Sequence, residues 1–169
     1  MRNVIQFIQR WFKSSSRLVP TRLDASQFGI RVEDFDPAAC KIIRVLTKAG
    51  FEAYIVGGAI RDLLCGVQPK DFDCVTDARP EQIKALFHRS QIIGRRFRLV
   101  HVRMKDQVIE VSTFRAHLKK KTRRAQTEDA PYGNLSTDAV RRDFTFNALY
   151  YDLITNEIID PVGAIADIQ

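Results

Sequence analysis

Two aspartates separated by one residue, Asp71 and Asp73, have the types and spacing best suited to chemistry in this sequence. If Phe72 lies in a strand, its two neighbours point to the same face of the sheet, so their carboxylates lie close together. Carboxylates held that close repel each other, and either protonation of one or a bound hard cation relieves the repulsion. Aspartate oxygens suit Mg²⁺ or Mn²⁺. Alone, such a pair is typical of surface or capping residues, and the divalent-metal site is the functional hypothesis.

A glycine pair upstream of the aspartates has the features of a phosphate-binding turn. Gly57 and Gly58 follow an apolar strand that ends at Val56, and they precede a helix expected over residues 59–64. Glycines at such a turn let backbone N–H groups approach an anion at a helix N-terminus. Arg61 lies one turn into the helix, and its planar guanidinium suits phosphate. We therefore expect a metal site beside a phosphate site.

Glu110 is the candidate for a third acidic group at the metal site. It stands among the apolar residues Val108, Ile109 and Val111, where an unpaired charge is costly. Two explanations remain open at this point. Glu110 either joins the aspartates at the metal site or forms an ion pair with one of the many arginines.

The sequence Arg141, Arg142, Asp143 is the second candidate contribution to the same pocket. We expect a helix here, capped by Ser136 or Thr137 and continuing through the aromatic run that follows. In such a helix Asp143 and the residue four positions later share a face. Alone, an Arg-Arg-Asp cluster is typical of a surface ion pair, so its assignment depends on the first motif.

Apolar periodicity, glycine and proline predict the elements that must position these groups. We expect an extended lead-in before residue 37, a helix from Pro37 capped by Asp36 and ended by Gly50, a strand over 51–56, a strand over 71–75, a helix from Pro80, two strands over 92–104 and 108–114 joined by a turn at Lys105 and Asp106, and a closing hairpin around Asn156.

Composition sets the remaining limits. A chain of 169 residues, of which 45% are hydrophobic, suffices for one domain. The net charge of +7 favours a polyanionic partner, either nucleic acid or an anionic membrane surface. Three cysteines without a C-x-x-C pair predict a reducing, cytoplasmic compartment, with Cys65 and Cys74 as small buried residues.

Two basic segments could contact the polyanion. Residues 1–17 are amphipathic, and they are too short and too charged to span a bilayer. They suit a helix packed on the domain, an arm that touches RNA, or a peripheral contact with a membrane. The Lys- and Arg-rich stretch within residues 116–135 predicts a surface loop, either simply solvated or in contact with RNA.

Four motifs together resemble the head domain of the class II nucleotidyltransferases, the family of bacterial poly(A) polymerases and CCA-adding tRNA nucleotidyltransferases. The likeness extends over roughly residues 37–163, and the segment GRRFRLVHVR at 94–103 is similar to the poly(A) polymerase version. The motifs are GGAIRD at 57–62, KDFDC at 70–74, IEVSTFR at 109–115 and RRDFTFNALYYD at 141–152.

The resemblance implies an α+β nucleotidyltransferase (DNA polymerase β-like) head domain at residues 37–169, with a mixed sheet flanked by helices, after a lead-in at 1–36. It implies addition of AMP from ATP to RNA 3′ ends, or alternatively CCA addition or a non-catalytic remnant. The base-reading E-D-x-x-R motif and the neck, body and tail domains of such enzymes are missing here, so we expect a fragment or truncated relative. The roles implied are metal binding by Asp71 and Asp73, catalysis by Asp71, Asp73 and Asp143, and nucleotide binding by Gly58, Arg61 and Arg142. Glu110 as a third metal ligand and Gly57 as a phosphate-binding residue rest on the residue patterns above.

Overall fold

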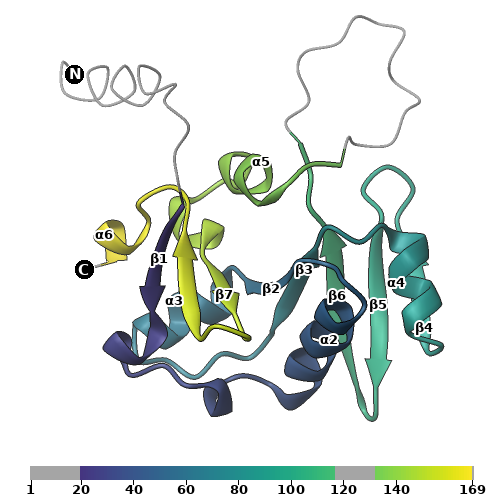
Figure 1. Cartoon of the computed structure of the whole chain (residues 1–169), viewed down its shortest axis with the longest axis horizontal. Helices are drawn as coiled ribbons and strands as arrows, with labels where there is room; N and C mark the ends of the chain where they lie inside the picture. The colour runs from purple at the N-terminus through teal and green to yellow at the C-terminus, as the bar shows by residue number, and fades with distance from the viewer. Residues whose placement is uncertain (1–19, 117–131, 169) are drawn as a thin grey trace, which may run out of the picture.

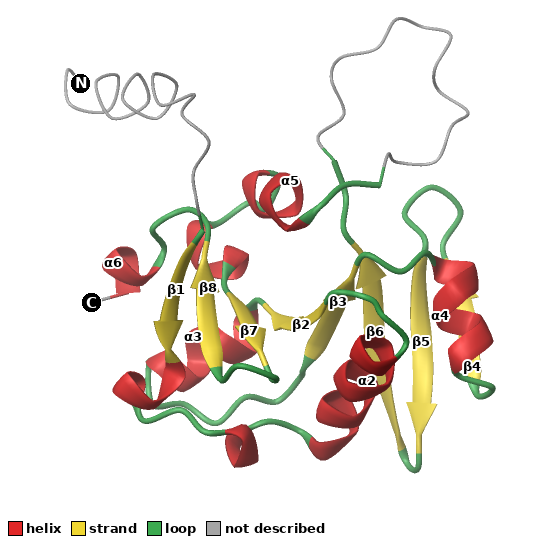
Figure 2. Ribbon diagram, viewed as in Figure 1, coloured by secondary structure: helices red, strands yellow, loops and turns green. Residues whose placement is uncertain are grey.

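A computed structural model describes residues 20–116 and 132–168. The amphipathic segment before residue 20 and the basic run at 119–124 lie outside these ranges. The described residues form an eight-stranded mixed sheet in the order β1-β8-β7-β2-β3-β6-β5-β4, flanked by helices (Figure 1; Figure 2). The predicted α+β class with a mixed sheet is therefore confirmed.

The strands and helices have the following bounds. The strands are β1 Thr21–Asp24, β2 Ala53–Val56, β3 Asp73–Thr76, β4 Ser90–Ile93, β5 Leu99–Met104, β6 Gln107–Thr113, β7 Tyr150–Asp152 and β8 Glu157–Asp160. The α-helices are α2 Pro37–Lys48, α3 Gly58–Leu64, α4 Pro80–Leu86, α5 Leu135–Val140 and α6 Ile165–Ile168, and the 3₁₀ helices are η1 Ala25–Phe28, η2 Val32–Asp34 and η3 Thr145–Ala148.

The pairing of β2, β3 and β6 determines which residues meet at the centre of the sheet. β2 and β3 are antiparallel, and Val56 at the end of β2 pairs with Asp73 at the start of β3. The glycine turn therefore begins directly beside the second aspartate. β3 and β6 are parallel, and Cys74 pairs with Val111. One step back along both strands, Asp73 lies beside Glu110.

Two apolar layers hold this sheet. On one face α2 packs against β2 and β3 through Ile42, Ile43 and Leu46, which are fully buried. Each such side chain contributes about 1.5 to 3 kcal/mol by leaving water. The predicted N-cap of α2 is confirmed, because the Asp36 carboxylate accepts the backbone N–H groups of the first turn at 2.7 and 3.1 Å. On the other face a smaller cluster lies under α5 and η3 and includes Phe114 and Tyr150.

The strand predicted over residues 92–104 is in fact two strands. β4 ends at Ile93, and the chain turns at Gly94 before β5 begins at Leu99. Gly94 has a φ of 87°, and a Cβ atom there would lie 2.7 Å from the carbonyl oxygen of Phe97. Only glycine fits this turn, and the turn separates β4 from β5. The predicted turn at Lys105 is confirmed, with a φ of 52°.

The long helix predicted through the Arg-Arg-Asp segment is wrong. The helix ends at Val140, its N-cap is Asn134 rather than Ser136 or Thr137, and the chain then passes through η3 into β7. Asp143 and Asn147 consequently do not share a helical face. Aromatic and β-branched residues favour helices weakly, and β7 contributes Tyr150 and Tyr151 to the pairing with β2 and β8.

Smaller differences concern the lead-in and one cysteine. Within the predicted extended lead-in, residues 21–24 form a sheet strand, which pairs antiparallel with β8. Arg22 in β1 forms ion pairs with Asp152 at 3.2 Å and Glu157 at 2.7 Å. Cys74 is buried as predicted, but Cys65 is exposed because it caps the C-terminus of the short helix α3.

No described helix is both long enough and apolar enough to cross a membrane.

Asp160 is expected to be a main support of the C-terminal turn. Its buried carboxylate accepts four backbone N–H groups at 2.8 to 3.2 Å, from Val162, Gly163, Ala164 and Ile165. We expect Asp160→Ala to lower the free energy of unfolding by about 2 to 3 kcal/mol, because it leaves these donors without their charged acceptor. Urea denaturation followed by circular dichroism measures the change. Asp160→Asn keeps one acceptor oxygen and should lose less; equal losses would contradict this explanation.

Candidate active site

The three acidic residues proposed as metal ligands line one cavity at the centre of the sheet, together with a fourth acid, Asp36. Asp71, Asp73 and Glu110 contribute to a cavity of about 520 Å³, which we call the acid cavity. The structure therefore brings together the three residues that the sequence proposed as metal ligands. The rest of the lining consists of Asp36, Lys70, Phe72, Gln107, Val108 and Ile109.

The local geometry around the aspartates differs from the prediction. The strand begins at Asp73, not at Asp71, so strand alternation alone does not place both carboxylates. The side chain of Phe72 contributes to their placement, since its ring packs edge-on against Phe35 with ring centres 6.1 Å apart. Because Phe72 is anchored in this way, the preceding residue, Asp71, lines the acid cavity although it lies outside the strand.

The premise for selecting Glu110 was wrong, although the residue does line the acid cavity. Alternation along β6 buries Ile109 and Val111 and turns Glu110 outward, where 53% of its side chain is exposed. No arginine pairs with it in the described part of the chain; instead Glu110 Oε1 lies 3.2 Å from Nε2 of His101 on the neighbouring strand.

The pKa of Asp73 reflects the electrostatic environment of the acid cavity. Partial withdrawal from water raises its pKa, and the negative charges of Glu110 and Asp71 raise it further, while Arg142 acts in the opposite direction. The ionised form is therefore held at an unfavourable potential, which a cation would relieve.

The donor set fits a hard divalent cation in chemical type. All three acidic groups offer carboxylate oxygens, which Mg²⁺ and Mn²⁺ prefer. Within residues 20–116 and 132–168, no three His, Cys, Asp or Glu side chains converge closely enough to hold one metal ion by themselves. Phosphate oxygens and water would have to complete the coordination, as is usual for Mg²⁺.

The glycine turn lies against the second candidate motif. Gly57 has a φ of 83°, and its N–H donates to the Leu149 carbonyl at 3.0 Å. A Cβ atom at Gly57 would lie 3.9 Å from Nη1 of Arg142, and one at Gly58 would lie 3.6 Å from Nη2 of Arg61. The structure thus gathers all four predicted nucleotide-binding residues around one turn.

Arg61 is held in place from two sides. Its Nε and Nη2 donate to Oδ1 of Asp62 at 2.9 and 2.6 Å. The guanidinium also lies over the ring of Phe146, 5.6 Å from the centroid. The Arg61 side chain remains 38% exposed, which leaves it accessible to a phosphate group.

A buried aspartate that the sequence did not single out organises the Arg-Arg-Asp segment. Asp138 is fully buried, and its two oxygens accept from Arg141 at 2.6 and 2.8 Å and from Arg142 at 2.9 and 3.1 Å. The Tyr150 hydroxyl and the backbone N–H of Arg115 also donate to Asp138. The sequence signal that could have identified Asp138 is its spacing, because it lies three residues before Arg141 and four before Arg142.

The charges around Asp138 set its protonation. Burial alone would raise the pKa of this carboxyl, but the two guanidiniums outweigh burial and lower the pKa below its ordinary value. Asp143, by contrast, is exposed and does not line the acid cavity. Asp138 is therefore the acidic residue of this segment that positions Arg142.

The architecture and the similarities of the chain define its class. The sheet and helices have the fold of nucleotidyltransferase head domains: the Bacillus stearothermophilus CCA-adding enzyme in complex with CTP matches with a TM-score of 0.66 and 36% identity, over 79% of this chain and 32% of that chain. The model of the Poly A polymerase head domain matches residues 53–169. The chain belongs to this family.

Curated relatives carry two names. Poly(A) polymerase I of Haemophilus influenzae is 45% identical over 157 residues, which cover 87% of this chain and 35% of the relative. The CCA-adding enzyme of Enterococcus faecalis is 42% identical over 130 residues, which cover 77% of this chain and 32% of the relative. The chain thus spans about a third of the length of these relatives.

Asp138→Asn should destabilise the protein strongly. Removal of this charge leaves Arg141 and Arg142 without their shared partner, and loss of one side of a buried ion pair costs about 3 kcal/mol. Because the folded pKa of Asp138 is lowered, its contribution is present at neutral pH and is lost as the pH falls below the ordinary value of 3.8. The free energies of unfolding of wild type and variant should therefore differ less in acid than at pH 7, which denaturant titrations at the two pH values measure. Asp143→Asn, the exposed control, should change stability by less than about 0.5 kcal/mol.

Asp73→Asn should have the opposite effect on stability. The raised pKa means that ionised Asp73 disfavours the folded state at neutral pH, so its neutralisation should raise the melting temperature in EDTA. Added Mg²⁺ should stabilise the wild type more than the variant. Thermal unfolding by calorimetry tests both statements, with Asp106→Asn as a control that removes an equal charge outside the acid cavity. A lower melting temperature for Asp73→Asn in EDTA would refute the explanation by desolvation and like charge.

Proposed function

We propose that the protein containing this chain transfers AMP from ATP to the 3′ end of RNA, as a template-independent polynucleotide adenylyltransferase. The observation that carries the proposal is the juxtaposition of the acid cavity with the Gly57–Gly58 turn and Arg142, through the pairing of Val56 with Asp73. Family membership supports the reaction class. The higher identity and longer match to Poly(A) polymerase I support AMP addition.

In this proposal each group has one task. Asp71 and Asp73 would hold Mg²⁺, and Glu110 would complete the acidic set beside the RNA end. When bound, Mg²⁺ supplies a lower pKa for the attacking hydroxyl and neutralises charge on the leaving pyrophosphate. The Gly57–Gly58 backbone with Arg61 and Arg142 orients the triphosphate, so that most of the rate comes from positioning and charge.

The reaction balances without a covalent enzyme intermediate. The RNA 3′ oxygen forms a bond to the α-phosphorus of ATP, and the bond from that phosphorus to the oxygen bridging to the β-phosphorus breaks. Pyrophosphate leaves with the electron pair, and the hydroxyl proton passes to water. This chain therefore needs no nucleophilic side chain, in agreement with a cavity lined by carboxylates, Gln107, Lys70 and apolar residues.

CCA addition is the second candidate, because the CCA-adding relative shares 42% identity with this chain. The two reactions differ in product. Repeated AMP incorporation lengthens an RNA primer in ATP alone, whereas CCA addition needs CTP before ATP and then stops. Contact of residues 1–17 with a membrane stays a prediction, since this segment lies outside the described residues.

Asp71→Asn and Asp73→Asn should each reduce AMP incorporation by at least about 100-fold, since each removes charge from the proposed metal site. The measurement is extension of a short RNA by labelled ATP with Mg²⁺, using the full-length protein, with CTP in parallel. Glu52→Gln, at an exposed position outside the acid cavity, is the charge-matched control, and circular dichroism verifies folding. Incorporation near the wild-type rate in either variant would defeat the proposed mechanism.

A further inference from the structure

The exposed face of the sheet changes from acidic to basic across four neighbouring strands. Asp73 in β3 lies beside Glu110 in β6, Glu110 pairs with His101 in β5, and His101 pairs with Gln91 in β4. Neighbouring strands are about 4.8 Å apart, so this row spans about 14 Å from Asp73 to the edge strand. The acid cavity and the sheet edge therefore share one continuous surface.

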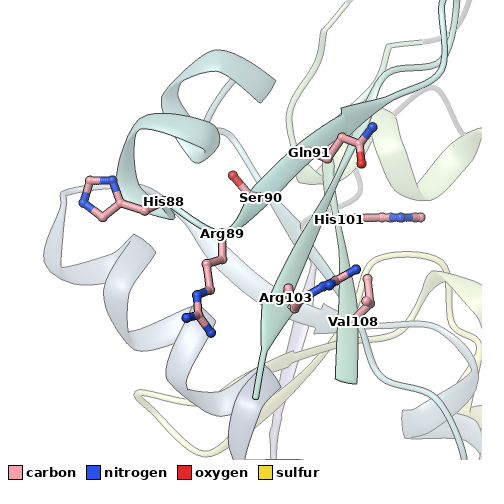
Figure 3. A pocket seen from close by; sticks show the side chains of 7 residues that line it. All are labelled: His88, Arg89, Ser90, Gln91, His101, Arg103 and Val108. Carbon is pink, nitrogen blue, oxygen red and sulfur yellow. The ribbon is translucent and has the colours of Figure 1, made fainter. Parts of the chain in front are cut away.

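The next row of residues brings two arginines to that edge. Arg103 pairs with Val108 across β5 and β6, and its backbone N–H donates to the carbonyl of Arg89 at 2.8 Å. Figure 3 shows His101, Arg103 and Val108 projecting from the same side of these strands. Together with His88, Ser90 and Gln91, these residues line a hollow of about 460 Å³, which we call the edge hollow.

Among the described residues, the cations of this surface have no acidic partner. Arg89 and Arg103 are exposed, and their guanidiniums form no ion pair or hydrogen bond with the described residues. A second hollow of about 780 Å³ shares both arginines and adds Lys41 and Lys105, with Asp106 as the one acid in its lining. Four cations that no described acid neutralises thus lie around the sheet edge, from its exposed face to α2, and make this edge suitable for an extended anion.

Shared residues join the basic surface to the acid cavity. Val108 lines both the acid cavity and the edge hollow, and Gln107 lines both the acid cavity and the second hollow. The Gln107 amide is fixed by donation to both oxygens of Asp36, at 2.9 and 3.0 Å. Val108 is 47% exposed, an unusual position for an apolar side chain between charged groups.

We infer that Arg89 and Arg103, assisted by Lys41 and Lys105, bind the phosphates of single-stranded RNA whose 3′ end enters the acid cavity beside Glu110. The placement of the RNA 3′ end at the acid cavity rests on the proposed function, whereas the positive charge of the surface is independent of it. Guanidiniums bind phosphate through paired N–H donors. The Val108 side chain offers an apolar contact for the ribose or base that lies between the arginines and the carboxylates.

The test compares two double variants of the full-length protein. Arg89→Ala/Arg103→Ala removes the proposed contacts, and Lys48→Ala/Lys84→Ala removes two exposed charges from the helices α2 and α4. A fluorescent oligoadenylate is titrated by anisotropy in EDTA, where no transfer occurs, over a range of NaCl concentrations. Binding of a fluorescent ATP analogue and thermal unfolding are measured on the same samples.

We expect the arginine variant to bind oligoadenylate about tenfold more weakly at low salt. The slope of log affinity against log salt should fall by about 1.4, because each phosphate contact of a single strand contributes about 0.7. ATP-analogue binding and the melting temperature should stay at wild-type values, and the lysine variant should bind RNA normally. Arg89→Lys/Arg103→Lys should recover most of the lost salt dependence.

Wild-type affinity and slope in the arginine variant, or an equal loss in the lysine variant, would overturn the inference. Loss of RNA binding in the arginine variant, combined with no AMP incorporation by the wild-type protein, would support this surface and overturn the proposed reaction. The two failures are therefore distinguishable.

Discussion

The site depends on how the negative charge gathered in the acid cavity is balanced. Asp71, Asp73 and Glu110 line one cavity, and the pKa of Asp73 is raised as a result of burial and of its neighbours' charges. The pairing of β2, β3 and β6 places Asp73 beside Glu110, and the contact between Phe72 and Phe35 anchors the segment that carries Asp71. Such stored repulsion is typical of functional sites, where a ligand rather than the protein supplies the missing positive charge.

The arginines beside the cavity need a different kind of support. Arg142 lies next to the glycine turn and is held from behind by Asp138, which in turn is held by Tyr150 and the backbone of Arg115. This arrangement keeps a guanidinium close to the acids without neutralising them directly. A phosphate group between the acid cavity and the arginines would be attracted by both a bound metal ion and a guanidinium, because its charge is negative.

Local signals in the sequence predicted most elements but not the exact course of the chain. Pro37 after Asp36 and Pro80 marked two helix starts because capping and proline geometry act within a few residues. The helix through Asp143 was predicted wrongly because pairing of β7 with β2, far away in sequence, outweighs local spacing. Glu110 was chosen for burial that strand alternation prevents, and Asp138 was missed because its burial depends on the assembled sheet. Asp73 lies beside the glycine turn because β3 pairs with β2, whereas Arg142 reaches the same turn from the segment that leads into β7, the other neighbour of β2.

The edge of the sheet at β1 has a consequence for biogenesis. β1 at Thr21–Asp24 completes its hydrogen bonds with β8 at Glu157–Asp160, so one of the earliest described segments to leave the ribosome must wait for one of the last. Among the described elements β8 is the only strand that pairs with β1, so β1 stays unpaired until β8 has been synthesised. Until that point β7 also lacks β8, its outer neighbour. Long-range pairing of this kind slows folding and leaves unpaired strand edges open to misassociation during synthesis. A nascent chain stalled before Glu157 would therefore be a natural substrate for chaperones.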